Sequence, residues 1–170
     1  MKLIQPKAKY LPQATVPSGS PEGLLEGIYK QIELAGRTCY KSEDNITEGS
    51  AKPFVDRMIK SNHTAMLEHG TVYLYAVDWD RNPLRHYWRN KYSRVKEIHL
   101  ETEHCQSDTS YKYAYYVTTN LRVLVENGWL DDLKYICKPT EFHEKRYTFR
   151  LTTSIGVTRE FNRHKLLCAA

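Results

Sequence analysis

The stretch from Ser154 to Ala170 reads Ser-Ile-Gly-Val-Thr-Arg-Glu-Phe-Asn-Arg-His-Lys-Leu-Leu-Cys-Ala-Ala, and its pattern predicts an amphipathic helix. The Ser154 hydroxyl can accept a hydrogen bond from an unpaired N–H of the first turn. Apolar residues recur at close to helical spacing and predict one buried stripe, made by Val157, Phe161, Leu166 and Leu167. The preceding segment, 144–153, alternates as a strand with Tyr147, Phe149 and Leu151 on one face.

The polar side of this helix carries two rows of charge. Arg159 lies one turn below Arg163, and Glu160 lies one turn below His164, because residues four apart stack on a helix. Like charges stacked in this way repel each other. The row of Arg159 and Arg163 therefore faces either water or a bound anion, and this helix alone leaves both interpretations open.

Further elements follow from periodicity and from turn residues. We expect helices from Pro21 to Gly36, from Ala51 to Ser61 and from Trp129 to Cys137, and strands at Thr71–Val77 and Tyr111–Thr118. A short helix should start at Thr119 or Asn120 and end at Gly128 in a left-handed cap.

The arrangement of these elements predicts an α+β fold. Thr71–Val77 is apolar or aromatic on both faces, which predicts a central strand. The connections are irregular, so we expect a mixed or antiparallel central sheet flanked by helices, in a single domain over 1–170. Residues 78–110 are the least organised part and are predicted to be an insertion or loop region.

Composition narrows the classes of function. The net charge of +5 suits a nucleotide, a polyanion or a phosphate-bearing cofactor without choosing among them. The four cysteines are widely separated and have no metal-binding spacing, which favours reduced thiols in a cytoplasmic protein. No apolar run is long enough to span a bilayer, so no membrane partner is expected.

Bases alternate with aromatic residues between Arg85 and Arg94, in the order Arg-His-Tyr-Trp-Arg-Asn-Lys-Tyr-Ser-Arg. Such a segment can bind nucleic acid by stacking and phosphate contacts. No RRM, KH or helix-turn-helix pattern surrounds it, and we favour a solvated insertion over a nucleic-acid partner.

Three polar residues crowd the turn that leads into the strand at Thr71, namely His63, Glu68 and His69. Loops beside central strands are common places for ligands. A zinc site is an alternative here, but His-x5-His is not an established zinc spacing, and we expect no metal. One histidine should pack, and the other should face a pocket.

Two common kinds of site are absent from the sequence. There is no glycine-rich phosphate loop, and neither a nucleophilic serine elbow nor a local cysteine signature occurs. A phosphorylated ligand would therefore be bound by separate Arg, Lys and His side chains of the terminal helix, with Glu160 as an acceptor.

Three segments of the sequence resemble the flavin-dependent thymidylate synthases, and they occur along the chain in the same order as in that family. Residues 159–165, Arg-Glu-Phe-Asn-Arg-His-Lys, are similar to the Arg-His-Arg signature of that family. Residues 35–42, Ala-Gly-Arg-Thr-Cys-Tyr-Lys-Ser, resemble its early A-G-R-x-C-Y-x-S segment. Residues 63–69, His-Thr-Ala-Met-Leu-Glu-His, resemble its G-H-x-x-x-L-E-H segment, which leads directly into a strand.

The resemblance implies a homotetrameric enzyme of nucleotide biosynthesis that methylates dUMP to dTMP. Methylenetetrahydrofolate would donate the carbon, and FAD, reduced by NADPH, would carry the hydride. By position, the FAD contacts would be His69, Thr71, Arg163, His164 and Lys165. The dUMP site would be lined by Glu160, Phe161, Asn162 and Arg163.

The sequence also departs from the family pattern. Lys165 stands where the family has Arg, and an ammonium lacks the planar two-pronged geometry of a guanidinium. Cys168 replaces the first serine of the signature, and the sequence stops before the rest of it. We therefore expect an incomplete form of the enzyme, with a catalytically inactive remnant or binding module of the same fold as the alternative.

Overall fold

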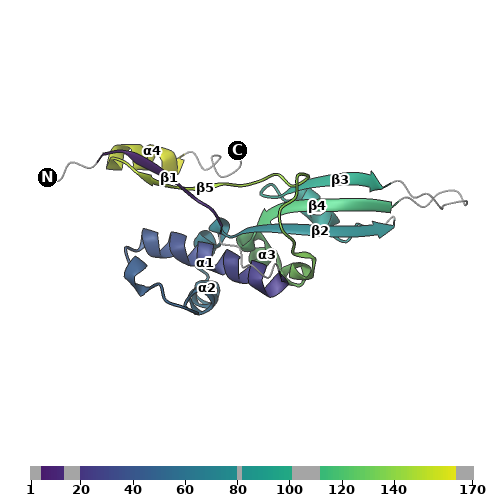
Figure 1. Ribbon diagram of the computed structural model, residues 1–170, viewed down its shortest axis with the longest axis horizontal. Helices are drawn as coiled ribbons and strands as arrows, with labels where there is room; N and C mark the ends of the chain where they lie inside the picture. Colours follow the sequence, from purple (N-terminus) through teal and green to yellow (C-terminus); the bar gives the residue numbers. More distant parts are fainter. Residues whose placement is uncertain (1–4, 14–19, 80–81, 101–111, 164–170) are drawn as a thin grey trace, which may run out of the picture. The chain divides into compact units, whose positions relative to one another are not determined.

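The computed structural model describes residues 5–13, 20–79, 82–100 and 112–163. In chain order the helices and strands are β1 (Lys7–Leu11), α1 (Pro21–Cys39), η1 (Glu43–Asn45), α2 (Ala51–Lys60), η2 (Thr64–His69), β2 (Thr71–Trp79), η3 (Arg85–Arg89), β3 (Arg94–Leu100), β4 (Lys112–Asn120), α3 (Leu121–Asn127), η4 (Leu130–Tyr135), β5 (Thr148–Thr152) and α4 (Ile155–Arg163), where η marks a 3-10 helix (Figure 1).

The chain divides into two compact units. The smaller contains residues 1–12 and 147–170, and the larger contains residues 13–146. The single domain expected over 1–170 stays a prediction.

The larger unit is built on a three-stranded antiparallel sheet in the order β2-β4-β3 (Figure 1). Its register places Thr71 opposite Asn120 and Arg94 opposite Thr118, so β2 and β3 both begin at the end of the sheet where β4 finishes. Helices and an antiparallel sheet together confirm the α+β class. The family-specific fold stays a prediction.

The prediction that the strand at Thr71 is central was wrong, because β4 is the central strand and β2 lies at an edge. Two other parts of the chain cover that edge. Gln13 pairs with the backbone of Thr71. The Cys137 N–H donates to the Tyr73 carbonyl at 2.9 Å, and Ile136 forms an isolated bridge with Leu74. The outer edge of β2 is therefore closed by irregular chain rather than by another strand.

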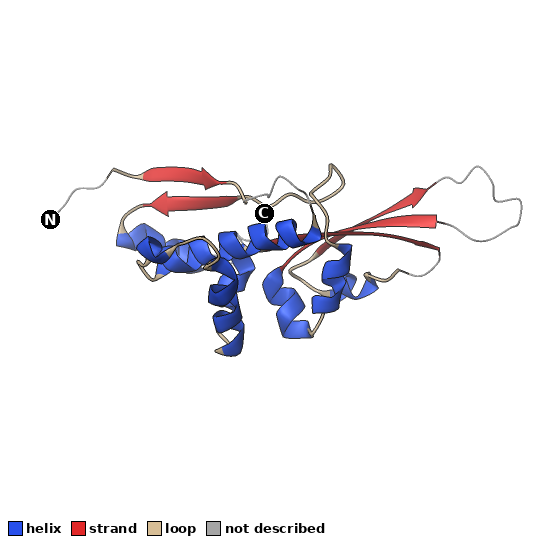
Figure 2. Cartoon of the chain, turned by 60° about the horizontal axis from the view of Figure 1, so that its bottom comes forward, coloured by secondary structure: helices blue, strands red, loops and turns tan. Residues whose placement is uncertain are grey.

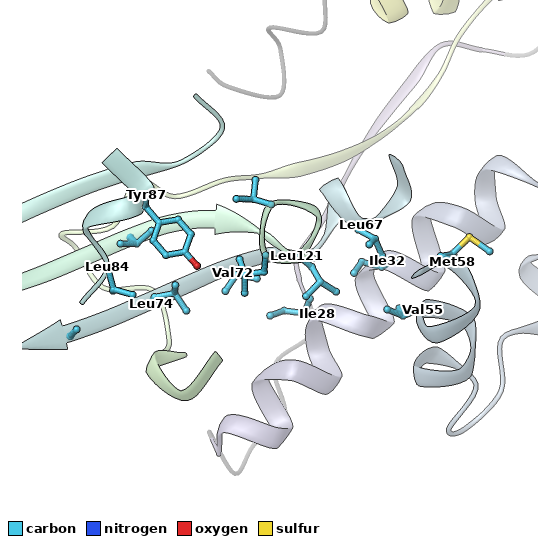
Figure 3. Close-up of a cluster of buried hydrophobic side chains, with 14 of the residues drawn as sticks. Ile28, Ile32, Val55, Met58, Leu67, Val72, Leu74, Leu84, Tyr87 and Leu121 are labelled. Carbon is cyan, nitrogen blue, oxygen red and sulfur yellow. The ribbon is translucent and has the colours of Figure 1, made fainter. Parts of the chain in front are cut away.

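The core lies between the sheet and the first two helices. Figure 3 shows Ile28 and Ile32 of α1 between Val55 of α2 and Val72 of β2. The predicted inward face of α2 is confirmed for its buried members, Phe54, Val55 and Met58.

Local turn chemistry around α3 is as predicted. The Asn120 side chain accepts a hydrogen bond from the Val123 N–H at 3.0 Å and caps the helix. Gly128 ends it with φ 71°, a left-handed conformation that glycine adopts without strain. The helix expected over Trp129–Cys137 is shorter and tighter, since only Leu130–Tyr135 is helical and as 3-10 helix.

The segment predicted as an insertion or loop region, 78–110, contributes to the sheet. It contains the end of β2, η3 and the whole of β3, which pairs with β4 from Arg94 to Leu100. Tyr87 and Leu84 of this segment are fully buried. The charge-rich composition hid this strand because only one of its edges is paired.

The smaller unit pairs β1 with β5 in an antiparallel ribbon, which Figure 2 shows as two neighbouring arrows. The strand predicted over 144–153 is confirmed only for Thr148–Thr152. Its aromatic face is exposed, although Tyr10 packs against Phe149 with ring centres 5.6 Å apart.

The terminal helix begins where predicted, with the Thr158 N–H donating to the Ser154 carbonyl at 3.1 Å. Its predicted buried stripe is wrong at Val157, which is exposed together with Ile155. The Phe161 side chain and residues Leu166 and Leu167 lie outside what the structure describes.

Gly36 was predicted to end the first helix, but α1 continues to Cys39. The glycine has a packing role instead. A Cβ at this position would lie 2.6 Å from Cζ of Phe54 and 3.7 Å from Cγ of Met66, so only glycine lets the Phe54 ring approach the helix.

Replacing Gly36 with alanine should lower the free energy of unfolding by about 1–3 kcal/mol, because the methyl group overpacks the Phe54 ring. Gly156→Ala is the matched control, since it is also helical but a Cβ there meets nothing within 4 Å. That change should be neutral or stabilising by up to about 1 kcal/mol. Urea unfolding followed by circular dichroism measures both, and equal effects would contradict the packing role.

A second stability prediction concerns His143, which is buried against the covered edge of β2. Its Nδ1 accepts the Thr140 N–H at 3.1 Å, so the proton is on Nε2, which donates to the Leu74 carbonyl at 3.1 Å. Burial lowers the pKa of His143 from its usual 6.5, against the opposing effect of that carbonyl.

The unfolded chain therefore takes up this proton at a higher pH than the folded chain does. Stability should be complete above about pH 6.5 and fall as the pH drops below it. His143→Gln keeps a donor for Leu74 and removes the titration, so its urea midpoint should fall less between about pH 7.5 and 5.5. In this variant the stability still depends partly on pH, because the pKa of His69 is also lowered. An unchanged pH profile would refute the role of His143.

Candidate functional site

The first two segments that resemble the family lie side by side. Tyr40, just after α1, places its hydroxyl 3.0 Å from Nδ1 of His63, which precedes η2. Their rings meet edge to face at 6.0 Å. On the buried side of α1, Gly36 faces Met66, since a Cβ built on Gly36 would lie 3.7 Å from Cγ of Met66. Residues 35–42 and 63–69 thus form one continuous surface.

Arg37 is one of the two charged residues of the first segment, with Lys41, and it is already neutralised. Its guanidinium donates to the carboxylate of Glu33 at 3.0 Å, one helical turn away. Glu33 is buried and also accepts the Ser50 hydroxyl at 2.9 Å. The Arg37 side chain is only 14% exposed and stacks over the Phe54 ring. It stabilises the contact between α1 and α2 rather than offering a positive charge to a ligand.

The second segment is anchored by α3. Arg122 forms an ion pair with Glu68 of η2, and its Nε donates to Glu126 at 2.6 Å. Glu126 also accepts the Thr64 hydroxyl at 2.6 Å. This hydrogen bond first, and Arg122 second, hold the pKa of Glu126 below its usual value. Both ends of η2 are therefore tied to one helix, and two carboxylates share one positive charge.

His69, a predicted FAD contact, is the last residue of η2 and is exposed. Partial desolvation of its ring lowers the pKa of His69, and the neighbouring Glu68 opposes this. The imidazole is therefore neutral at pH 7. It can donate or accept a hydrogen bond, but it does not contribute a positive charge.

Thr71, the other predicted FAD contact in the larger unit, is buried. Its backbone is occupied on both sides by Gln13, whose amide donates to the Thr71 carbonyl and accepts its N–H, each at 3.1 Å. The Gly70 carbonyl, between the two predicted residues, accepts a hydrogen bond from the Leu121 N–H at 2.9 Å. The backbone from His69 to Thr71 is thus fixed from two directions.

The third segment belongs to the smaller unit. Glu160 is exposed on α4, and the backbone of Phe161, Asn162 and Arg163 continues that helix. His164 and Lys165 lie outside the described residues. The structure therefore brings the first two segments together, and the role of the third stays a prediction.

Other candidate sites have less support. Across the described residues, no group of three or more potential ligands could hold a metal ion, so His63, Glu68 and His69 do not form the alternative zinc site. A shallow hollow on α2 is lined by Pro53, Asp56, Arg57, Lys60 and Ser61, none of them a predicted site residue.

Cys137 and His143 also come together, with Sγ 3.7 Å from Nε2. They do not make an activated nucleophile. Burial raises the pKa of the Cys137 thiol to about 11, and Nε2 of His143 already carries its proton. The histidine therefore cannot accept the thiol proton at this atom.

Sequence reasoning missed a polar cluster between η3 and η4. The Asp132 carboxylate accepts from Nε2 of His86 at 2.8 Å and from the Tyr87 hydroxyl at 3.0 Å. The His86 ring packs on Trp129 with centres 4.3 Å apart. Burial, with Asp132, raises the pKa of Tyr87. The cluster joins two short helices that are 45 residues apart, and no local pattern signals such a contact.

Comparisons with family models, with curated proteins and with solved structures found no match for this chain. Within the ranges that the structure describes, no helix is both long enough and apolar enough to cross a membrane.

The network around Glu126 gives a direct test of the site's electrostatics. Thr64→Val and Arg122→Met should each raise the pKa of the Glu126 carboxyl, because the Thr64 hydroxyl and the Arg122 guanidinium both hold it below its usual value. NMR titration of the labelled carboxyl measures this. Lys52→Met, which removes the exposed pair with Asp56, should leave it unchanged. A Glu126 pKa that neither change moves would rule out the network.

Proposed function

We propose that the chain is a flavin-dependent thymidylate synthase that converts dUMP to dTMP. Methylenetetrahydrofolate would be the carbon donor, and FAD reduced by NADPH would supply the hydride. The observation that carries the proposal is the contact between the first two family-like segments. Tyr40 and His63 are 23 residues apart in sequence and meet through a hydrogen bond at a shared surface.

The ion pairs near His69 limit the negative charge that a cofactor would meet there. Glu68 and Glu126 would repel phosphate, but Arg122 pairs with both and offsets one of the two negative charges. A neutral His69 beside them can make a hydrogen bond without adding or opposing charge. The polar groups therefore fit an uncharged ring system close to His69, as an isoalloxazine or a base would present.

The positive charge for the phosphates would come from the terminal segment. Arg163, His164 and Lys165 would hold FAD, together with His69 and Thr71. Because both backbone groups of Thr71 are bound to Gln13, its part in the contact would come from its side chain. Glu160, with Phe161, Asn162 and Arg163, would line the dUMP site, where the carboxylate can accept an N–H of the base. A homotetramer is part of the same proposal.

The test is release of tritium from C5-labelled dUMP by the purified chain with FAD, NADPH and methylenetetrahydrofolate. His69→Ala should weaken FAD binding about tenfold, which corresponds to about 1.4 kcal/mol for one lost hydrogen bond. His99→Ala removes another exposed histidine, on β3, and should leave FAD binding unchanged.

The two measurements separate the proposal from its alternative. FAD retention without tritium release would favour an inactive remnant or binding module of the same fold. Absence of both at high protein concentration would sink the assignment, and so would equal FAD binding by the two variants.

A further inference from the structure

The segment between η3 and β3 presents exposed aromatic rings among positive charges, and the proposed enzyme does not use it. Trp88 is 56% exposed and Tyr92 is 52% exposed. No acidic residue occurs from 82 to 96, whereas five bases do: Arg85, Arg89, Lys91, Arg94 and Lys96. Large exposed aromatics on a folded surface require an explanation, because they cost hydrophobic free energy in water.

This surface is rigidly built. Residues 90–93 form a turn in which the Ser93 N–H donates to the Asn90 carbonyl at 3.1 Å. The Asn90 side chain accepts the Tyr92 N–H at 2.9 Å, and the Ser93 hydroxyl meets that of Thr119 at 2.8 Å. Arg146 also donates a hydrogen bond to the Tyr92 carbonyl at 2.5 Å. The turn thus projects Lys91 and Tyr92 from its tip on a fixed frame.

The 3-10 geometry of η3 determines which of its residues lie on the same face. Side chains three apart lie above each other in such a helix, so Arg85 and Trp88 share one side. Tyr87 is fully buried and anchors the helix to the core. Because Tyr87 points inward, the adjacent Trp88 points outward, on the same side of η3 as Arg85.

Two carboxylates close to this segment already have partners. Glu144 lies 3.6 Å from Arg94, and Asp132 is bound by His86 and Tyr87. In the part of the chain that the structure describes, Arg85, Arg89 and Lys91 form no ion pair. Lys91 instead lies 4.9 Å from the centre of the Tyr92 ring.

We propose that Trp88 and Tyr92, with Arg85, Arg89 and Lys91, form a surface that binds single-stranded nucleic acid. Aromatic faces stack on unpaired bases of any sequence, and flanking cations contact the backbone phosphates. The binding is sequence-tolerant, because hydrogen-bond readout of bases plays no part in it. A duplex binds less well, since its bases are already stacked on each other.

The experiment measures fluorescence anisotropy of an end-labelled oligothymidylate titrated with the full chain. Binding should saturate, and log K against log salt should have a slope of about −2, as three phosphate contacts to a single strand predict. The oligonucleotide should also quench part of the tryptophan fluorescence, and Trp88→Ala should abolish that quenching.

Substitutions separate stacking from charge. Trp88→Ala and Tyr92→Ala should each weaken binding at least about fivefold. Arg85→Gln combined with Arg89→Gln should reduce the salt slope by about 1.4. The matched controls are Tyr147→Ala, an exposed aromatic residue of the smaller unit, and Lys30→Gln combined with Lys60→Gln, which removes the same charge elsewhere. Both controls should bind like the unchanged chain.

Three results would overturn the proposal. The first is the absence of saturable binding at low salt. The second is an affinity of the Trp88 and Tyr92 variants equal to that of Tyr147→Ala. The third is competition by duplex DNA as strong as that by the single strand, which would reduce the surface to an unspecific basic patch.

Discussion

The closed outer edge of β2 is the constraint on which the larger unit depends. An exposed edge leaves backbone N–H and C=O groups unpaired, which is unfavourable for a strand with largely apolar side chains. Here Gln13 pairs the edge from one part of the chain, and Cys137 and His143 pair it from another. The strand can then bury Val72, Leu74 and Ala76 on one face and Tyr73 on the other while only one partner strand is present. Loss of this cover would expose the backbone that leads to His69.

The same closure determines what the candidate site can do. Gln13 fixes Thr71 at the start of β2, and Leu121 fixes Gly70. Arg122, next in the chain, pairs with both Glu68 and Glu126 and offsets one of their two negative charges. A backbone held in place favours a preorganised site, in which little entropy is lost when a ligand binds. The neutral His69 is the exposed functional group that this frame presents.

Local chemistry was readable from the sequence, and contacts between distant segments were not. The Asn120 cap and the Gly128 left-handed turn depend on neighbouring residues, and both were predicted correctly. The position of β2 was predicted wrongly, because apolar faces indicate burial without identifying what buries them. Gly36 looked like a helix end, since the ring of Phe54 that requires it lies in another helix.

The candidate site shows the same division. The resemblance marked His69 and Thr71, and the structure places them on one fixed stretch of backbone. Arg122 was not among the predicted site residues, because its partner Glu68 is 54 residues away. A weaker signal was present, since Glu126 follows Arg122 by four residues and such pairs face each other on a helix.

The sheet register relates the candidate site to the basic aromatic surface. Thr71 pairs with Asn120, and Arg94 pairs with Thr118, so β2 and β3 start on either side of the last residues of β4. Neighbouring strands are about 4.8 Å apart, which separates those two starting points by about 10 Å. Thr119 lies between them and binds Ser93 of the aromatic turn through its hydroxyl. A polynucleotide on that turn would therefore lie within a few nucleotides of the surface that carries His69.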